Sequence, residues 1–154
     1  MDISMTYEEK VKNKCHALLK LVIGFQEFYS RTNEDNQRFI ETTIGAAIWY
    51  LPKNHQILFT GKISKDAIRK GERSEDHLYP RKIAARKILE AQWEDERDSV
   101  ETLSKLYIER YGRFNYFSKS GNKKLIKFQK SEVFSNPETA YGNAGVELVD
   151  FDDI

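Results

Sequence analysis

The chain has 154 residues, of which 40% are hydrophobic and 32% charged, and its formal net charge is +1. This length suits one domain, and two Trp, eight Tyr and nine Phe residues provide enough apolar surface for a core, which excludes a disordered chain. No apolar run approaches the ~18 residues of a transmembrane helix, and residues 1–4 lack the features of a signal peptide. The single Cys15 excludes an internal disulfide and a cysteine-based zinc site, so we expect a soluble protein of the reducing cytoplasm.

The near-zero net charge hides a pattern along the chain. Residues 56–90 carry nine basic and five acidic groups, and residues 113–130 carry six basic groups and no acidic one. Residues 91–112 and 131–154 are acidic, the latter with six carboxylates and no basic group. If both basic blocks share one face, that face suits a polyanion. The alternative is that the acidic tail neutralises the block at 113–130 within the fold.

The first third of the chain predicts two helices. Residues 6–30 are expected to form a helix that Thr6 caps, because apolar residues recur there at three- and four-residue spacing. This stripe consists of Val11, Cys15, Leu18, Leu19, Val22, Phe25 and Phe28. Asn33 is predicted to cap a second helix that ends near Leu51. Its apolar face consists of Phe39, Ile40, Ile44, Ala47, Ile48 and Leu51.

The middle of the chain alternates short strands and helices. Residues 56–60 predict a strand that ends at Gly61, followed by a loop over 62–78 with one helical turn at 64–70. Pro80 fits the first turn of the next helix, since its missing N–H costs nothing there. Another helix is expected over 98–111, ended by Gly112.

The last part predicts a second strand over 114–118, a turn at 120–122 and an ambiguous segment over 123–130. Residues 137–154 are expected to be mostly loop, with a short strand at 146–149. These elements predict a helix-rich α+β fold, a single domain with a small sheet. Within it we distinguish an N-terminal helical part (1–51), a candidate active-site part (56–130) and an acidic C-terminal segment (131–154).

The densest cluster of reactive side chains lies within residues 75–82. It consists of Glu75, Asp76, His77, Tyr79, Arg81 and Lys82, next to Pro80. An imidazole takes or gives a proton near neutral pH, and a guanidinium holds a phosphate through two N–H groups. These groups are typical of phosphodiester cleavage. The alternative interpretation is that Asp76 caps the following helix, His77 bonds locally and Arg81 faces solvent.

Two basic turns accompany this cluster. Lys62 and Lys65 follow the first predicted strand, and the second turn follows the aromatic strand. The second turn offers Ser118, Asn122, Lys123 and Lys124. Lysines beside Phe114 and Tyr116 fit single-stranded nucleic acid, which binds by base stacking and phosphate contacts. Taken alone, each of the two segments is typical of a basic surface turn.

Four short motifs together carry a resemblance. They are Trp49-Tyr50-Leu51-Pro52, Thr60-Gly61-Lys62-Ile63-Ser64, the segment 75–82, and Tyr141-Gly142-Asn143-Ala144-Gly145-Val146-Glu147-Leu148. They resemble small proteins of tailed phages and bacteria, and are similar to His-Asn-His nucleases and to phage endonucleases of the T-even endonuclease IV kind. The resemblance implies that His77 is a general base and that Ser118 and Asn122 occupy the later turn.

This chain departs from the His-Asn-His pattern in three ways. In that family the Asp-His pair belongs to a β-hairpin and the Asn follows soon after. Here Asp76 and His77 precede a predicted helix, Asn122 lies 45 residues after His77, and no later His exists. In addition, Ser120 and Gly121 replace the acidic pair that the small phage and bacterial proteins carry in their later turn. Any Mg²⁺ is therefore expected on Glu75 or Asp76 together with the substrate phosphate.

The sequence thus predicts a nuclease that acts on DNA or RNA. The expected catalytic residues are His77, Arg81 and Asn122. The expected substrate-binding residues are Lys62, Lys65, Tyr79, Lys82, Ser118, Lys123 and Lys124. One alternative is a non-catalytic nucleic-acid-binding module. Another is a phage factor that binds a host protein, for which the acidic tail at 149–154 is a candidate docking segment.

Overall fold

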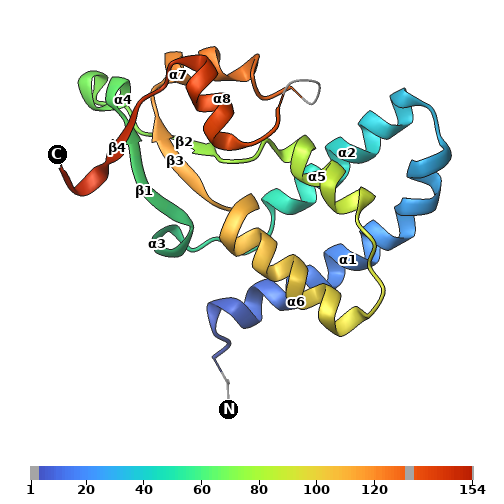
Figure 1. Ribbon diagram of the computed structural model, residues 1–154. Coiled ribbons are helices and arrows are strands. Elements are labelled where there is room, and N and C mark those ends of the chain that lie inside the picture. Colours follow the sequence, from blue (N-terminus) through green and yellow to red (C-terminus); the bar gives the residue numbers. More distant parts are fainter. Residues whose placement is uncertain (1–3, 131–133, 154) are drawn as a thin grey trace. The chain divides into compact units, whose positions relative to one another are not determined.

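The structure, a computed structural model, describes residues 4–130 and 134–153 and has an α+β fold with a small four-stranded sheet (Figure 1). The chain forms two compact units. The first comprises Met1–Asn54 and Arg81–Gly112, and the second comprises His55–Pro80 and Arg113–Ile154. The part expected as one active-site segment, 56–130, is thus divided between them. No helix in the described ranges has the length and apolar character needed to cross a membrane.

The first unit is helical. It contains α1 (Tyr7–Arg31), α2 (Glu34–Trp49), α5 (Arg81–Glu90), α6 (Glu96–Leu106) and the π-helical η1 (Tyr107–Tyr111). The Thr6 and Asn33 side chains accept hydrogen bonds from backbone N–H groups of the first turns of α1 and α2, so both predicted caps are confirmed. Glu9 completes a capping box with Thr6. Gly112 follows the last turn, as expected.

The core of the first unit follows most of the predicted stripe. The buried positions of α1 are Val11, Cys15, Leu18, Leu19, Val22 and Tyr29. Three predicted core residues are instead exposed: Phe25, Phe28 at 55% and Phe39 at 72%. Near the end of α1, Tyr29 is buried in place of Phe25 and Phe28. Its hydroxyl donates to the buried Glu41 carboxylate at 2.6 Å. A polar pair therefore replaces the predicted phenylalanine packing at this end.

The second unit contains the sheet. Its strands are β1 (Phe59–Ser64), β2 (Ser74–His77), β3 (Phe114–Phe117) and β4 (Leu148–Asp150), in the order β2-β3-β1-β4. Its helices are α3 (His55–Leu58), α4 (Lys65–Lys70), α7 (Lys119–Ile126), α8 (Pro137–Ala144) and the 3-10 turn η2 (Phe151–Asp153). Strand β3 is parallel to β1 and antiparallel to β2, and β4 is antiparallel to β1.

Several expectations for this unit need correction. Residues 56–58 lie in α3 rather than in a strand, and Gly61 lies inside β1. The register between β1 and β3 shifts there, and a φ of 83° at Gly61 fits the bulge. Residues 74–77, expected as loop, form β2, because the β3 ladder pairs all four of them. The predicted helical turn at 64–70 is confirmed as α4.

The expected turn at 120–122 and loop at 137–144 are both helices. The Ser118 side chain accepts from the Gly121 N–H and starts α7, and the Asn136 side chain accepts from the Thr139 N–H and starts α8. In each case a side-chain cap turns a polar, turn-like segment into a helix. Gly145 ends α8 with a φ of 69°.

The two faces of the sheet differ, because side chains alternate along each strand. Phe117 of β3 packs with Leu125 of α7 and with Ala140 and Tyr141 of α8, so these two helices cover one face. The opposite face carries an aromatic cluster: His55, Phe59, Phe114, Tyr116 and Phe151, whose ring centroids lie 4.7–5.9 Å apart in the contacting pairs.

The start of the acidic tail belongs to the sheet. Asp150 of β4 forms an ion pair with Lys62 of β1, and the Phe151 ring packs edge-on against Phe59. The tail therefore pairs with the first basic block at this point. Residue 154 and the side chain of residue 153 lie outside what the structure describes.

Candidate active site

The predicted pair of Asp76 and His77 lies on β2, which forms a strand–strand–helix arrangement with β3 and α7. Asp76 and His77 occupy the last two positions of β2, where they face Asn115 and Phe114 of the antiparallel β3. Helix α7, which carries Asn122, begins two residues after β3 ends. The residues that separate His77 from β3 in the chain contribute mostly to the first unit. The pair and Asn122 therefore belong to the antiparallel strand pair of β2 with β3 and to the helix that follows β3.

Asp76 and His77 point to opposite faces of the sheet. The His77 ring lies 6.1 Å from the Phe114 ring, on the face with the aromatic cluster. Asp76 lies on the face covered by α7 and α8, where Tyr141 donates to its Oδ2 at 3.4 Å. Since both residues sit where β2 ends, their side chains flank the carboxyl end of that strand.

The Asp76 carboxylate terminates a line of polar groups across the sheet. Thr60 of β1 donates to the Asn115 amide oxygen, and Asn115 Nδ2 donates to the Tyr141 hydroxyl at 3.0 Å. Asn115 is 1% exposed. Burial raises the pKa of Asp76 to about 7, against the opposing effect of hydrogen bonds from Tyr141 and Gln129. A carboxyl with such a pKa exchanges its proton near neutral pH, and perturbed pKa values of this kind are found at functional sites as well as at buried structural positions.

Asn122 and Ser118 have different roles in α7. Ser118 is fully buried, caps the helix and donates to the Asp66 carboxylate at 2.5 Å, so its bonds are structural. Asn122 Oδ1 is buried and has no hydrogen-bond partner in the described part of the chain. An amide oxygen in this state has an acceptor to offer to a cation or a water.

Arg81, Lys82 and Tyr79 do not belong to the elements β2, β3 and α7. Arg81 and Lys82 begin α5 and belong to the first unit, where the Arg81 guanidinium stacks 4.7 Å from the Trp49 ring. Tyr79 remains in the second unit and packs its ring edge-on against Phe134 at 5.7 Å. The structure thus gives Arg81 an aromatic partner that the cluster in the sequence did not indicate.

The four predicted lysines of the second unit fall into two groups. Lys62 pairs with Asp150, and Lys65 Nζ lies 2.6 Å from the Glu147 carboxylate. Lys123 and Lys124 are exposed on α7 and have no ion-pair partner within residues 4–130 and 134–153. Lys119, Lys127 and Lys130 are exposed and equally unpaired in those ranges, so this segment presents a basic surface.

Arg113 was absent from the predicted substrate-binding residues. Its backbone carbonyl accepts from the Leu78 N–H at 3.0 Å, directly beyond the pairing of His77 with Phe114. Arg113 therefore lies at the carboxyl end of β2. Its Nε is buried and finds no hydrogen-bond partner among the described residues. A signal for it was present in the sequence, since an arginine directly precedes the aromatic strand.

The donor set for a metal ion is small. Within 4–130 and 134–153, no group of three or more His, Cys, Asp or Glu side chains is arranged to hold a metal. Mg²⁺ is commonly bound by one or two protein oxygens together with water and substrate phosphate. The partly buried Asp76 carboxylate and the unpartnered Asn122 Oδ1 are oxygens of this kind. Glu75 is exposed and lies on the other face of β2 from Asp76.

Comparison of the chain with protein-family models, with curated proteins and with solved structures produced no match.

Proposed function

We propose that this chain is a nuclease that hydrolyses phosphodiester bonds of nucleic acid at the carboxyl end of β2. The observation that carries the proposal is the strand–strand–helix arrangement of β2, β3 and α7, in which Asp76 and His77 end the first strand and Asn122 lies on the helix. The sequence alone did not indicate this strand pair, because residues 78–113 separate its two strands.

In this proposal His77 is the general base. A phosphate at the end of β2 would lie beside His77, on the face of the sheet that carries the aromatic cluster. His77 takes a proton from a water molecule as the water oxygen attacks phosphorus, and the bond from phosphorus to the leaving oxygen breaks. Arg113 supplies positive charge at the same strand end, which favours the phosphate and the charge that develops on it.

The second unit offers two oxygens to a Mg²⁺ ion, the Asp76 carboxylate and the unpartnered Asn122 Oδ1. An ion held by either residue would polarise a phosphate oxygen when bound. The raised pKa of Asp76 is consistent with this role, since a cation beside the carboxylate would favour its ionised form.

The basic surface of α7 supports a polyanionic substrate. Lys119 and Lys123 of α7 and the C-cap residue Lys127 recur at four-residue spacing, which places side chains on one side of a helix. None of them is neutralised by a carboxylate of the described residues. Such a surface binds a phosphate backbone with an affinity that falls steeply with salt. The same feature supports the alternative of a binding module without catalysis.

The test is a cleavage assay with labelled single- and double-stranded DNA and RNA, with Mg²⁺ and with EDTA. We expect wild-type protein to cleave and His77→Ala to lose cleavage by ~100-fold or more while it still binds, because general-base catalysis contributes about that factor. His16→Ala is the matched control, since His16 pairs with Glu96 on the first unit.

Each outcome decides between the two functions. Cleavage by His77→Ala at the wild-type rate would remove His77 from the mechanism. Salt-sensitive binding by the wild type without any product would contradict the nuclease and favour the binding module. Loss of cleavage in EDTA would support the metal-dependent form, and full activity in EDTA would exclude it.

A further inference from the structure

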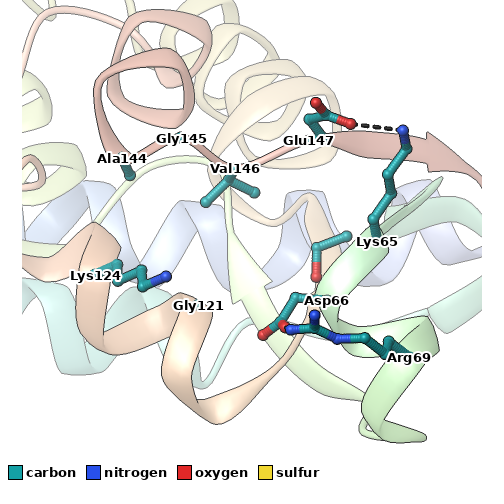
Figure 2. A pocket seen from close by; sticks show the side chains of 10 residues that line it. Lys65, Asp66, Arg69, Gly121, Lys124, Ala144, Gly145, Val146 and Glu147 are labelled. Atoms are coloured by element: carbon teal, nitrogen blue, oxygen red, sulfur yellow. Dashed lines mark hydrogen bonds and ion pairs between the residues drawn. The ribbon is translucent and has the colours of Figure 1, made fainter.

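We infer that a pocket of the second unit, distinct from the end of β2, binds one nucleotide of the nucleic acid through its phosphate group; this rests on the proposed function. The pocket has a volume of about 280 Å³ and lies between α4, α7 and the turn from α8 to β4 (Figure 2). Three cationic side chains line it: Lys65, Arg69 and Lys124. Ligand pockets generally start at about 300 Å³, so this volume suits a single nucleotide rather than a longer segment.

The two carboxylates that line the pocket, Asp66 and Glu147, already form ion pairs with neighbouring basic side chains. The Asp66 carboxylate pairs with both Arg69 and Lys70, and it also accepts hydrogen bonds from Ser118 and Ser120. These donors hold the pKa of Asp66 far below its usual range, with the Ser118 bond as the largest cause, so Asp66 stays ionised. Arg69 and Lys70 thus carry two positive charges against the single negative charge of Asp66. One positive charge is left over, and it lies beside the pocket that Arg69 lines.

The second carboxylate at the pocket, Glu147, is matched by one lysine. Lys65 Nζ lies 2.6 Å from Glu147, and this pairing lowers the pKa of Glu147. Figure 2 shows the pair at the rim, next to the end of the turn from α8. The charges of Lys65 and Glu147 cancel each other. The net positive charge of the pocket therefore comes from Arg69 and Lys124.

Lys124 provides the second excess charge. Its side chain extends from α7 toward Val146 and Asp66 (Figure 2), and no carboxylate among the described residues pairs with it. A lysine ammonium is a common phosphate ligand. The neighbouring Lys123 is also exposed on α7 but does not line the pocket, so the helix directs only one of the two lysines there.

The other walls suit the uncharged part of a nucleotide. Ala144 and Val146 contribute apolar side chains, and Gly145 between them has a φ of 69° and no atom within 4 Å of an added Cβ. This turn thus presents two small apolar groups and bare backbone opposite the cations. An apolar wall facing a cationic one fits a sugar and base attached to a phosphate.

The experiment compares Lys124→Ala with Lys123→Ala. Calorimetric titration of wild-type protein and both variants uses adenosine monophosphate, inorganic phosphate and a single-stranded oligonucleotide. We expect Lys124→Ala to weaken adenosine monophosphate binding by ~10-fold or more, the equivalent of one charge-assisted hydrogen bond, and Lys123→Ala to change it by less than ~2-fold. Adenosine monophosphate should bind more tightly than inorganic phosphate.

A second variant approaches the pocket from its uncharged wall. Ala144→Leu adds volume to the pocket without changing charge, so it should also weaken adenosine monophosphate binding while Lys123→Ala does not. Because Ala144 also packs against the core cluster of Phe117 and Leu125, binding is compared only at a temperature where the variant is fully folded. Circular dichroism establishes that each variant is folded. Equal effects of the two lysine variants on adenosine monophosphate binding, wild-type affinity in Ala144→Leu, or equal affinity for inorganic phosphate and the nucleotide would each overturn the inference. The oligonucleotide is not used for the lysine comparison, because it also contacts the basic surface that includes Lys123.

Failure of this inference is separable from failure of the proposed function. A protein that cleaves nucleic acid but shows no difference between the two lysine variants lacks the pocket site and keeps the nuclease. A protein that binds the nucleotide through Lys124 but yields no cleavage product keeps the pocket and loses the nuclease.

Discussion

Tyr141 of α8 donates its hydroxyl to the Asp76 carboxylate of β2 at 3.4 Å, and the same hydroxyl accepts from Asn115 Nδ2 at 3.0 Å. Each donor in this line points toward Asp76, because Thr60 in turn donates to Asn115. The arrangement gives a partly buried carboxyl a partner without neutralising it by a cation. It therefore predicts both the pH dependence of stability and the effect of removing single members.

Asp76 is expected to destabilise the protein at neutral and alkaline pH. Its pKa is about 7 in the folded state against an ordinary 3.8, so between these values the folded state holds a proton that the unfolded state releases. Stability therefore falls as pH rises from about 4 to 7. With about 1.4 kcal/mol for each pKa unit, Asp76→Asn should raise the unfolding free energy by on the order of 2–4 kcal/mol near pH 8 and little near pH 4.

Urea unfolding in EDTA at both pH values measures this difference. Glu75→Gln is the control, because Glu75 is the exposed neighbour on β2, and it should change stability by less than about 0.5 kcal/mol. A destabilised Asp76→Asn variant near pH 8 would contradict the prediction.

Asn115 is expected to be the most sensitive member of the line. Asn115→Ala leaves the Thr60 hydroxyl and the Tyr141 hydroxyl without their partner in a buried setting, and should cost about 2–3 kcal/mol. Asn143 on α8 is exposed, and Asn143→Ala should leave stability within about 0.5 kcal/mol. Chemical denaturation of both variants checks this, and similar midpoints would argue against a buried polar line.

Glu41 of the first unit is expected to matter through its charge. It is buried, accepts from the Tyr29 hydroxyl at 2.6 Å and pairs with Arg86 Nε at 3.1 Å. Glu41→Ala should cost about 3 kcal/mol or more, because it leaves a cation without its buried partner. Glu27→Ala, which breaks an exposed pair with Arg31, should cost less than about 0.5 kcal/mol. Thermal unfolding separates the two, and equal melting temperatures would contradict this reading.

Two glycines of the first unit are expected to respond in opposite directions. A Cβ at Gly112 would lie 2.8 Å from the Tyr107 ring and 2.9 Å from its carbonyl oxygen, so Gly112→Ala should destabilise by about 1–3 kcal/mol. A Cβ at Gly24 would meet nothing within 4 Å. Gly24 lies inside α1, so Gly24→Ala should stabilise by up to about 1 kcal/mol. Melting temperatures that shift in the same direction would refute the contact at Gly112.

The α+β class and the first two helices could be predicted because their signals are local. Thr6 and Asn33 cap helices whose apolar spacing continues for several turns. Strand β2 had no such signal, since Ser74, Glu75, Asp76 and His77 are all polar and become a strand through their ladder with β3, about 40 residues later. Helix α7 was missed because Ser120 and Gly121 favour a turn, while the Ser118 cap favours a helix.

The sequence predicted several of the residues of the candidate site, but it did not predict which of them lie together in the structure. Asp76 and His77 were identified from their neighbours in sequence, but so was Arg81, which lies in the first unit. Arg113 reaches the end of β2 through sheet pairing, and Asn115 and Tyr141 reach Asp76 through packing on the covered face. Contacts of this kind depend on strand register, which local composition does not encode.

The insertion of residues 81–112 between β2 and β3 has a consequence for the order of folding. All parts of the first unit have been synthesised once Gly112 is made, whereas the sheet of the second unit still lacks β3 and β4. During synthesis the sequence of the helical unit is therefore complete first. At that stage strands β1 and β2, within residues 55–80, still lack the strands with which they pair. Strand β2, which carries Asp76 and His77, can pair with β3 only after residues 114–117 have left the ribosome. The candidate active site therefore assembles late.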